Sequence, residues 1–109
     1  MTRGDVVVVA APGDYGKPRP AVVVQTDVLP VEHPSVIVCR MTSDLVDDAD
    51  FRVTIEPGAA SGLRSRSQVM ADKPVTVRRE RIGRKIGRLP PSEMIRLNVA
   101  LAFVLGLAD

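Results

Sequence analysis

The chain has 109 residues, of which 45% are hydrophobic, and its formal net charge is +2. This length predicts a single domain over residues 1–109, which can bury about two-thirds of the surface of its unfolded chain without metal or disulfide support. One cysteine and one histidine cannot supply the ligands of a zinc site, and neither the GxGxxG nor the GxxxxGK(S/T) phosphate-binding motif occurs. We therefore expect a protein with no metal and no cofactor.

No segment is predicted to target or span a membrane. The apolar run 6–11 is shorter than the roughly 7 to 15 residues of a secretory signal, and Asp5 interrupts the approach to it. The apolar stretch 99–108 is far below the ~20 residues that span a bilayer. We expect a soluble cytoplasmic protein.

Charge is distributed unevenly along the chain. Residues 1–63 contain 5 Lys+Arg and 9 Asp+Glu, a net −4, whereas residues 64–109 contain 10 and 4, a net +6. Most of the positive charge lies in RRERIGRKIGR, residues 78–88. Such a run is as typical of an ordinary solvated face as of a polyanion-binding surface, and both interpretations stay open here.

The first half of the chain is predicted to form strands. Short β-branched runs separated by turn residues predict strands over DVVVVAA (5–11), AVVVQ (21–25), SVIVCRM (35–41) and FRVTI (51–55). The run 6–9 is apolar at every position, so at least one strand should be covered on both faces.

Further along, two short strands are possible around residues 68–70 and 75–77. Gly83 and Gly87 argue against a long helix in the segment that follows. From Pro91 the pattern changes to helical spacing of apolar residues and ends at Gly106. We predict a mainly β fold, a small barrel-like sheet of about five strands with a C-terminal helix.

The predicted helix has more apolar residues than one stripe requires. Ile95, Val99, Ala100, Ala102 and Phe103 extend its apolar surface. The surplus is compatible with a symmetric homodimer interface and equally with a wide stripe inside the core of a monomer.

Two residues of reactive type are predicted to be structural. Cys39 lies in the apolar run SVIVCRM, which is typical of a buried thiol. His33 lies in the Pro-rich connection VEHPS, which favours a solvated loop residue. No nucleophile motif accompanies them, so Ser/His/Asp catalysis has little support.

Arg19 and Thr42 are the candidates for chemistry. Pro18 and Pro20 stiffen the chain on both sides of Arg19, and Thr42 and Ser43 follow the third predicted strand. A guanidinium and a hydroxyl at one rim of a sheet can donate hydrogen bonds to a phosphodiester and stabilise charge in its transition state. RNA suits such a site because its own 2′-OH is the nucleophile. A solvated arginine and a threonine that merely ends a strand are the alternatives.

Several segments, in order, resemble the MazF/PemK toxins, the endoribonucleases of bacterial toxin–antitoxin pairs. The resemblance runs from about Arg3 to Leu107 and is most specific in GDYGKPRPAVVVQ; the other segments are RGDVVVV, SVIVCRMTSD, SQVMADKPVTVRRERIGRKIGRL and LNVALAFVLGL. It implies an SH3-like barrel with a C-terminal helix, a homodimer, and a MazE-like acidic antitoxin that docks across the dimer. It also implies metal-independent, sequence-selective cleavage of single-stranded RNA that leaves a 2′,3′-cyclic phosphate and a 5′-hydroxyl.

The resemblance also implies roles for residues. The catalytic arginine of the family's RP motif falls on Arg19, and its catalytic threonine or serine falls on Thr42, with Ser43 in reserve. A guanidinium keeps its protons, so Arg19 is expected to stabilise the phosphate rather than act as a base. No residue is assigned to the 2′-OH proton.

RNA contacts beyond these two residues are expected from stacking and charge. Tyr15 is the aromatic residue of the loop before Arg19, and Phe51 is another stacking candidate. Charge predicts backbone contacts at Lys17, Arg78, Arg79, Arg81, Arg84 and Lys85.

Two rival functions remain. A non-catalytic relative of the same barrel poisons DNA gyrase through a segment that ends in Trp-Gly-Ile, whereas this sequence ends in LGLAD and contains no tryptophan. A barrel that only binds nucleic acid is the second rival, although the presence of Arg19 and Thr42 argues against it.

Overall fold

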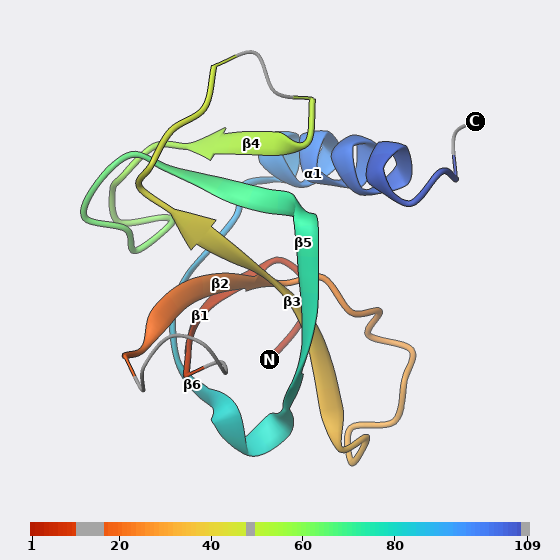
Figure 1. Cartoon of the computed structure of the whole chain (residues 1–109). Helices are drawn as coiled ribbons and strands as arrows, with labels where there is room; N and C mark the ends of the chain where they lie inside the picture. Colours follow the sequence, from red (N-terminus) through yellow and green to blue (C-terminus); the bar gives the residue numbers. More distant parts are fainter. Residues whose placement is uncertain (11–16, 48–49, 108–109) are drawn as a thin grey trace.

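The computed structural model describes residues 1–10, 17–47 and 50–107, which form six strands and one α-helix (Figure 1). The strands form one antiparallel sheet in the order β4-β5-β3-β2-β1-β6. Their bounds are β1 Asp5–Val9, β2 Arg19–Val23, β3 Ser35–Thr42, β4 Arg52–Ile55, β5 Ser67–Arg78 and β6 Ile82–Arg88. A 3-10 turn, Arg79–Arg81, joins β5 to β6, and the helix α1 spans Pro91–Val104. The mainly β fold with a C-terminal helix is confirmed.

The prediction was incomplete between residues 67 and 88. The two short strands expected there are one continuous strand, β5. Pro74 lies in its middle and pairs with Cys39, directly before a register shift in the β3–β5 ladder. A proline is tolerated at such an irregularity because a ladder hydrogen bond is already missing there. The segment with the two glycines is also a strand, β6, which pairs with β1.

The glycine of β6 at position 87 reflects a close approach by another segment. A Cβ on Gly87 would lie 2.2 Å from the carbonyl carbon of Ser61, in the loop between β4 and β5. From the other side, a Cβ on Gly62 would lie 1.9 Å from the carbonyl oxygen of Ile86. The Arg88 amide donates to the Ala60 carbonyl at 2.8 Å. The loop after β4 therefore covers β6. β4 and β6 are the two edge strands of the sheet, and this loop connects them in space.

β1 is buried on both faces, as its apolar run predicts. Val6 belongs to the core between the sheet and α1, together with Val22, Val69 and Leu97. Val7 belongs to a second core on the other face of the sheet. Each fully buried valine contributes about 1.5–3 kcal/mol relative to an exposed one. The second core consists of Val7, Val9, Ala21, Val23, Val36, Val38 and Val77.

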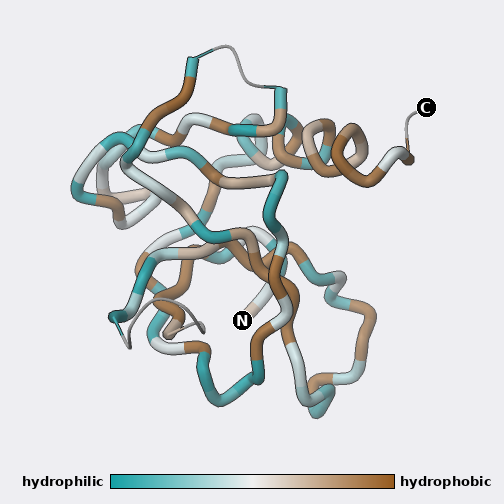
Figure 2. The backbone as a smooth tube through the Cα atoms, viewed as in Figure 1, coloured by the Kyte–Doolittle hydropathy of each residue, from teal (hydrophilic) through white to brown (hydrophobic). Residues whose placement is uncertain are grey.

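α1 packs on β4 and β5 along one face only (Figure 1). Leu97 and Ala100 are buried against the sheet, whereas Ile95, Val99 and Phe103 are 64%, 66% and 52% exposed. Brown segments along the helix in Figure 2 show this apolar character. The wide stripe inside the core of the monomer is therefore wrong for these three residues. No helix among the described residues is long and apolar enough to cross a membrane.

Cys39 and His33 have structural surroundings. Cys39 is fully buried in β3, and burial raises the pKa of its thiol to about 12, so the prediction of a structural thiol is confirmed. His33 is half-buried rather than solvated. Its Nδ1 lies 3.0 Å from the Ser35 carbonyl, and its own carbonyl accepts from Arg79 Nε at 2.8 Å. Both contacts are local to the start of β3.

Candidate functional site

Arg19 and Thr42 line the same surface groove, which has a volume of about 1040 Å³. Their neighbourhood follows from strand register. β2 and β3 are antiparallel, and Ala21 is opposite Arg40. Arg19 lies two residues before Ala21, and Thr42 lies two residues after Arg40, so the same register places them next to each other. The start of one antiparallel strand lies beside the end of its neighbour, so the two side chains occupy one rim of the sheet.

The groove is strongly basic. Among the described residues that line it are five cationic side chains and a single carboxylate, that of Asp44. Such an excess of one sign attracts a polyanion and raises its local concentration. The cationic residues are Arg19, Arg40, Arg64, Arg84 and Lys85.

Four segments of the chain bring these charges together. Arg19 and Arg40 come from β2 and β3, Arg64 from the loop after β4, and Arg84 and Lys85 from β6. The contact between that loop and β6 places the last two segments side by side. The walls of the groove therefore depend on the same packing that covers the edge strand.

Thr42 keeps its hydroxyl proton available. Its Oγ1 accepts a hydrogen bond of 3.0 Å from the Asp44 amide, which fixes the side chain through its oxygen. A hydroxyl that accepts one bond can still donate one. Thr42 is half-buried and Ser43, also in the groove, is exposed.

Arg19 opens β2 and is exposed. Pro20 pairs with Val8 of β1, and both Pro18 and Pro20 line the groove beside it. Fixed φ angles at these two prolines restrict the backbone that carries the guanidinium.

Lys85 forms an ion pair with a buried carboxylate, that of Asp5. Asp5 is 2% exposed, and its Oδ1 lies 3.3 Å from Lys85 Nζ and 2.8 Å from Arg88 Nη1. The Thr2 amide donates to Asp5 Oδ2 at 2.8 Å. Burial acts to raise the pKa of Asp5, but these hydrogen bonds and charges outweigh it and the pKa is lowered. Asp5 is thus an anion that holds Lys85 and Arg88 on the edge strand.

Of the other predicted contacts, Arg84 and Lys85 line the groove, whereas Lys17, Arg78 and Arg79 do not. Lys17 is exposed and precedes Pro18, while Tyr15 lies outside the described residues. Arg78 is the last residue of β5 and Arg79 the first of the 3-10 turn, and the Arg79 side chain donates to the His33 carbonyl. The basic segment 78–88 is therefore divided, and only Arg84, Lys85 and their neighbour Ile86 line the groove.

Sequence reasoning missed Arg40 and Arg64. A signal for Arg40 was present, because residues two apart in a strand share a face and Arg40 precedes Thr42 by two. Arg64 lies in a loop, where no periodicity applies. Within residues 1–10, 17–47 and 50–107, no three His, Cys, Asp or Glu side chains gather as a metal site would require.

The chain is similar in sequence and fold to known proteins. The profile of the family described as "PemK-like, MazF-like toxin of type II toxin-antitoxin system" matches residues 2–105. A protein of Mycolicibacterium smegmatis named "Probable endoribonuclease MazF" is 40% identical over 109 residues, which cover 99% of each chain.

Two solved structures share the fold. One is described as an endoribonuclease in complex with its cognate antitoxin from a mycobacterial species; its TM-score is 0.82 at 25% identity, over 98% of this chain and 96% of that one. A MazE-MazF structure from Deinococcus radiodurans has a TM-score of 0.77 at 20% identity, over 98% of this chain and 97% of that one.

Proposed function

Since the chain belongs to the family of PemK-like, MazF-like toxins of type II toxin–antitoxin systems, we propose that it is an endoribonuclease, the toxin of such a pair. Its substrate is single-stranded RNA, which it cleaves at selected sequences without a metal ion. The observation that carries the proposal is the groove in which Arg19 and Thr42 lie together among an excess of positive charge.

The proposed reaction uses the nucleophile of the substrate itself. The ribose 2′-oxygen loses its proton and attacks the adjacent phosphorus, the bond from phosphorus to the 5′-oxygen breaks, and that oxygen gains a proton. The products are a 2′,3′-cyclic phosphate and a 5′-hydroxyl.

Arg19 and Thr42 act on the phosphate in this scheme. Arg19 donates two parallel N–H bonds to non-bridging oxygens, and Thr42 donates its O–H. Both bonds strengthen as negative charge builds up in the pentavalent transition state.

We propose that the toxin is a homodimer. Ile95, Val99 and Phe103 form an uncovered apolar stripe on α1, and a second copy can cover it through a symmetric contact.

An antitoxin is the second proposed partner. The groove complements an acidic peptide as well as it complements RNA, which supports an antitoxin segment that blocks it. A structural relative at 25% identity is described in complex with its cognate antitoxin.

The test is cleavage of a long single-stranded RNA in excess EDTA, with the ends of the fragments mapped. We expect the wild type to cut at one short recurrent sequence and Arg19→Ala to leave the RNA intact. Arg19→Lys should also be inactive, because lysine keeps the charge but lacks the planar fork. Lys73→Ala is the control, since it removes an exposed cation of β5 outside the groove.

Intact RNA with every protein would overturn the proposal. Relaxation or breakage of DNA in a gyrase supercoiling assay would then favour the gyrase-poison function. Retention of RNA on the protein without cleavage would favour a binding module.

A further inference from the structure

The chain leaves the sheet after Thr42 and forms the rim of the groove. Ser43 and Asp44 both line the groove, directly beside the residue proposed to contact the phosphate. Leu45 and Val46, the next two residues, are 46% and 44% exposed. Both side chains leave close to half of their surface in water, so packing holds this segment less firmly than it holds the core strands.

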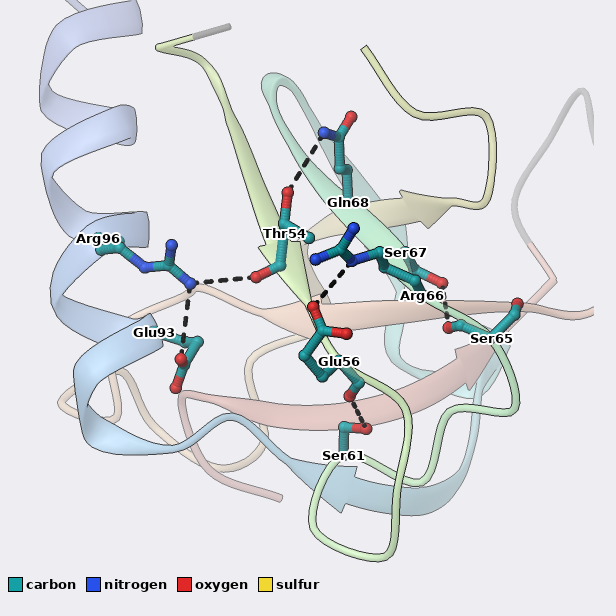
Figure 3. A network of polar contacts seen from close by, with 9 residues as sticks. All are labelled: Thr54, Glu56, Ser61, Ser65, Arg66, Ser67, Gln68, Glu93 and Arg96. Atoms are coloured by element: carbon teal, nitrogen blue, oxygen red, sulfur yellow. Dashed lines mark hydrogen bonds and ion pairs between the residues drawn. The ribbon is translucent and has the colours of Figure 1, made fainter. Parts of the chain in front are cut away.

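Gln68 supplies a polar attachment instead. Its Oε1 accepts from the Val46 amide at 2.9 Å, and its Nε2 donates to the Val46 carbonyl, also at 2.9 Å. Nε2 additionally lies 3.3 Å from Thr54 Oγ1 on β4, a contact visible in Figure 3. The side-chain amide thus makes with Val46 the pair of hydrogen bonds that the backbone of a neighbouring strand would make.

The same residue is also the backbone neighbour of Thr42. Thr42 and Gln68 are directly opposite in the β3–β5 ladder, so Gln68 is fixed in the sheet beside the start of the loop. Its side chain then reaches Val46, four residues later. Residues 42–46 are therefore attached to β5 at both ends, with the Asp44 amide bonded to Thr42 Oγ1 between them.

We propose that Gln68 is a positioning residue that orders residues 42–46 and so aims the Thr42 hydroxyl at the substrate phosphate. The inference rests on the proposed ribonuclease function. Gln68 is 6% exposed and does not line the groove, so it acts through the loop rather than through RNA.

A planar amide of this length satisfies both atoms of Val46, because it carries a donor and an acceptor side by side. Methionine has nearly the same shape but can neither donate to the carbonyl nor accept well from the amide. An ionised glutamate accepts from the amide but repels the carbonyl, whereas a protonated glutamate donates and accepts as glutamine does.

The first experiment compares Gln68→Met with Thr54→Val in steady-state RNA cleavage. We expect Gln68→Met to lower kcat about ten- to a hundredfold, as misplacement of a reacting group by about 1 Å does, with a smaller change in KM. Thr54→Val removes only the 3.3 Å contact and keeps the β-branched shape, so it should cleave as the wild type does. Equal kcat for Gln68→Met and the wild type would overturn the inference.

Gln68→Glu adds a readout that a generally weakened fold would not give. Burial raises the pKa of the introduced carboxyl above its usual value of about 4.3. The ratio of kcat for Gln68→Glu to kcat for the wild type, taken at each pH, should be near unity where this carboxyl is protonated. The ratio should fall as rising pH ionises the carboxyl. The Gln68→Met ratio should stay constant over the same range, and a constant ratio for Gln68→Glu would contradict the proposal.

Amide hydrogen exchange tests the attachment without any RNA. In the wild type the Val46 amide should exchange more slowly than that of Leu45, and Gln68→Met should remove this difference while Thr54→Val preserves it. An unprotected Val46 amide in the wild type would overturn the inference even if the chain cleaves RNA. Failure of the wild type to cleave RNA, with Val46 protected, would instead reject the proposed function and leave the attachment standing.

Discussion

Thr42 offers the proposed reaction a single hydroxyl, and its side chain contributes little else. We expect Thr42→Ala to lower kcat by about 10²-fold, the usual effect of removing one transition-state donor. Thr42→Ser keeps the hydroxyl and should retain most of the activity. The free energy of unfolding should change by less than about 1 kcal/mol, since Thr42 is half-buried at a strand end. Full activity of Thr42→Ala in a folded protein would transfer the role to another donor such as Ser43.

Asp5 is the residue whose loss should affect stability most directly. Asp5→Asn leaves Lys85 and Arg88 without their shared anion at a position that is 2% exposed. We expect a loss of about 2 kcal/mol in the free energy of unfolding at pH 7, measured by urea denaturation.

Acid should reduce this difference between the wild type and Asp5→Asn. The pKa of Asp5 is lowered in the folded state, so the unfolded chain binds its proton first as pH falls. The stabilisation is fully present above the unfolded value of about 3.9 and is lost as pH falls through the lower folded value. A difference that stays constant from pH 7 to pH 2 would show that the carboxylate charge is not what stabilises the fold.

The sequence singled out Arg19 by its two flanking prolines and Thr42 by its place after a patterned strand, and the structure places both in one groove. Arg64 was beyond reach, since its place in the groove depends on how the loop after β4 packs against β6. For the basic segment 78–88, the sequence predicted more groove contacts than the structure contains. Its composition is uniform, yet only part of it faces the groove, and only tertiary packing decides which part.

At the scale of elements, short runs of β-branched residues between turn residues identified β1 to β4, and apolar residues at helical spacing identified α1. β5 was divided in the prediction because Pro74 normally interrupts a strand, and its tolerance here depends on a register shift in the partner strand. β6 carries glycines where another backbone approaches closely, so the residues that weaken its strand signal are those that its packing requires.

The contact between the loop and β6 makes Gly62 a sensitive position. Gly62→Ala places a Cβ against the Ile86 carbonyl oxygen at a residue with φ of +75°. We expect a loss of at least about 2 kcal/mol in the free energy of unfolding. Gly58→Ala is the matched control, because Gly58 also has a positive φ, +148°, but no atom within 4 Å of the added Cβ. Equal losses in the two variants would show that backbone conformation, and not the close approach, is what matters.

The apolar stripe on α1 belongs to the whole molecule, because one copy of the chain leaves it uncovered. We expect the wild type to sediment as a dimer and Phe103→Glu to sediment as a monomer, since a charge in an apolar contact is costly to desolvate. Thr76→Glu introduces the same charge at an exposed position on β5 and should leave the dimer intact. An unchanged dimer for Phe103→Glu would place the interface elsewhere.

The groove is assembled from both ends of the chain, and this affects when toxicity can arise during synthesis. Its walls combine the start of β2 and the end of β3 with a loop that is held in place by β6. A nascent chain that has exposed its first five strands has Arg19 and Thr42 but lacks the strand that completes the groove around them. We therefore expect the chain to cleave no RNA for most of its translation and to become active only when its last quarter, which begins with β6, has emerged.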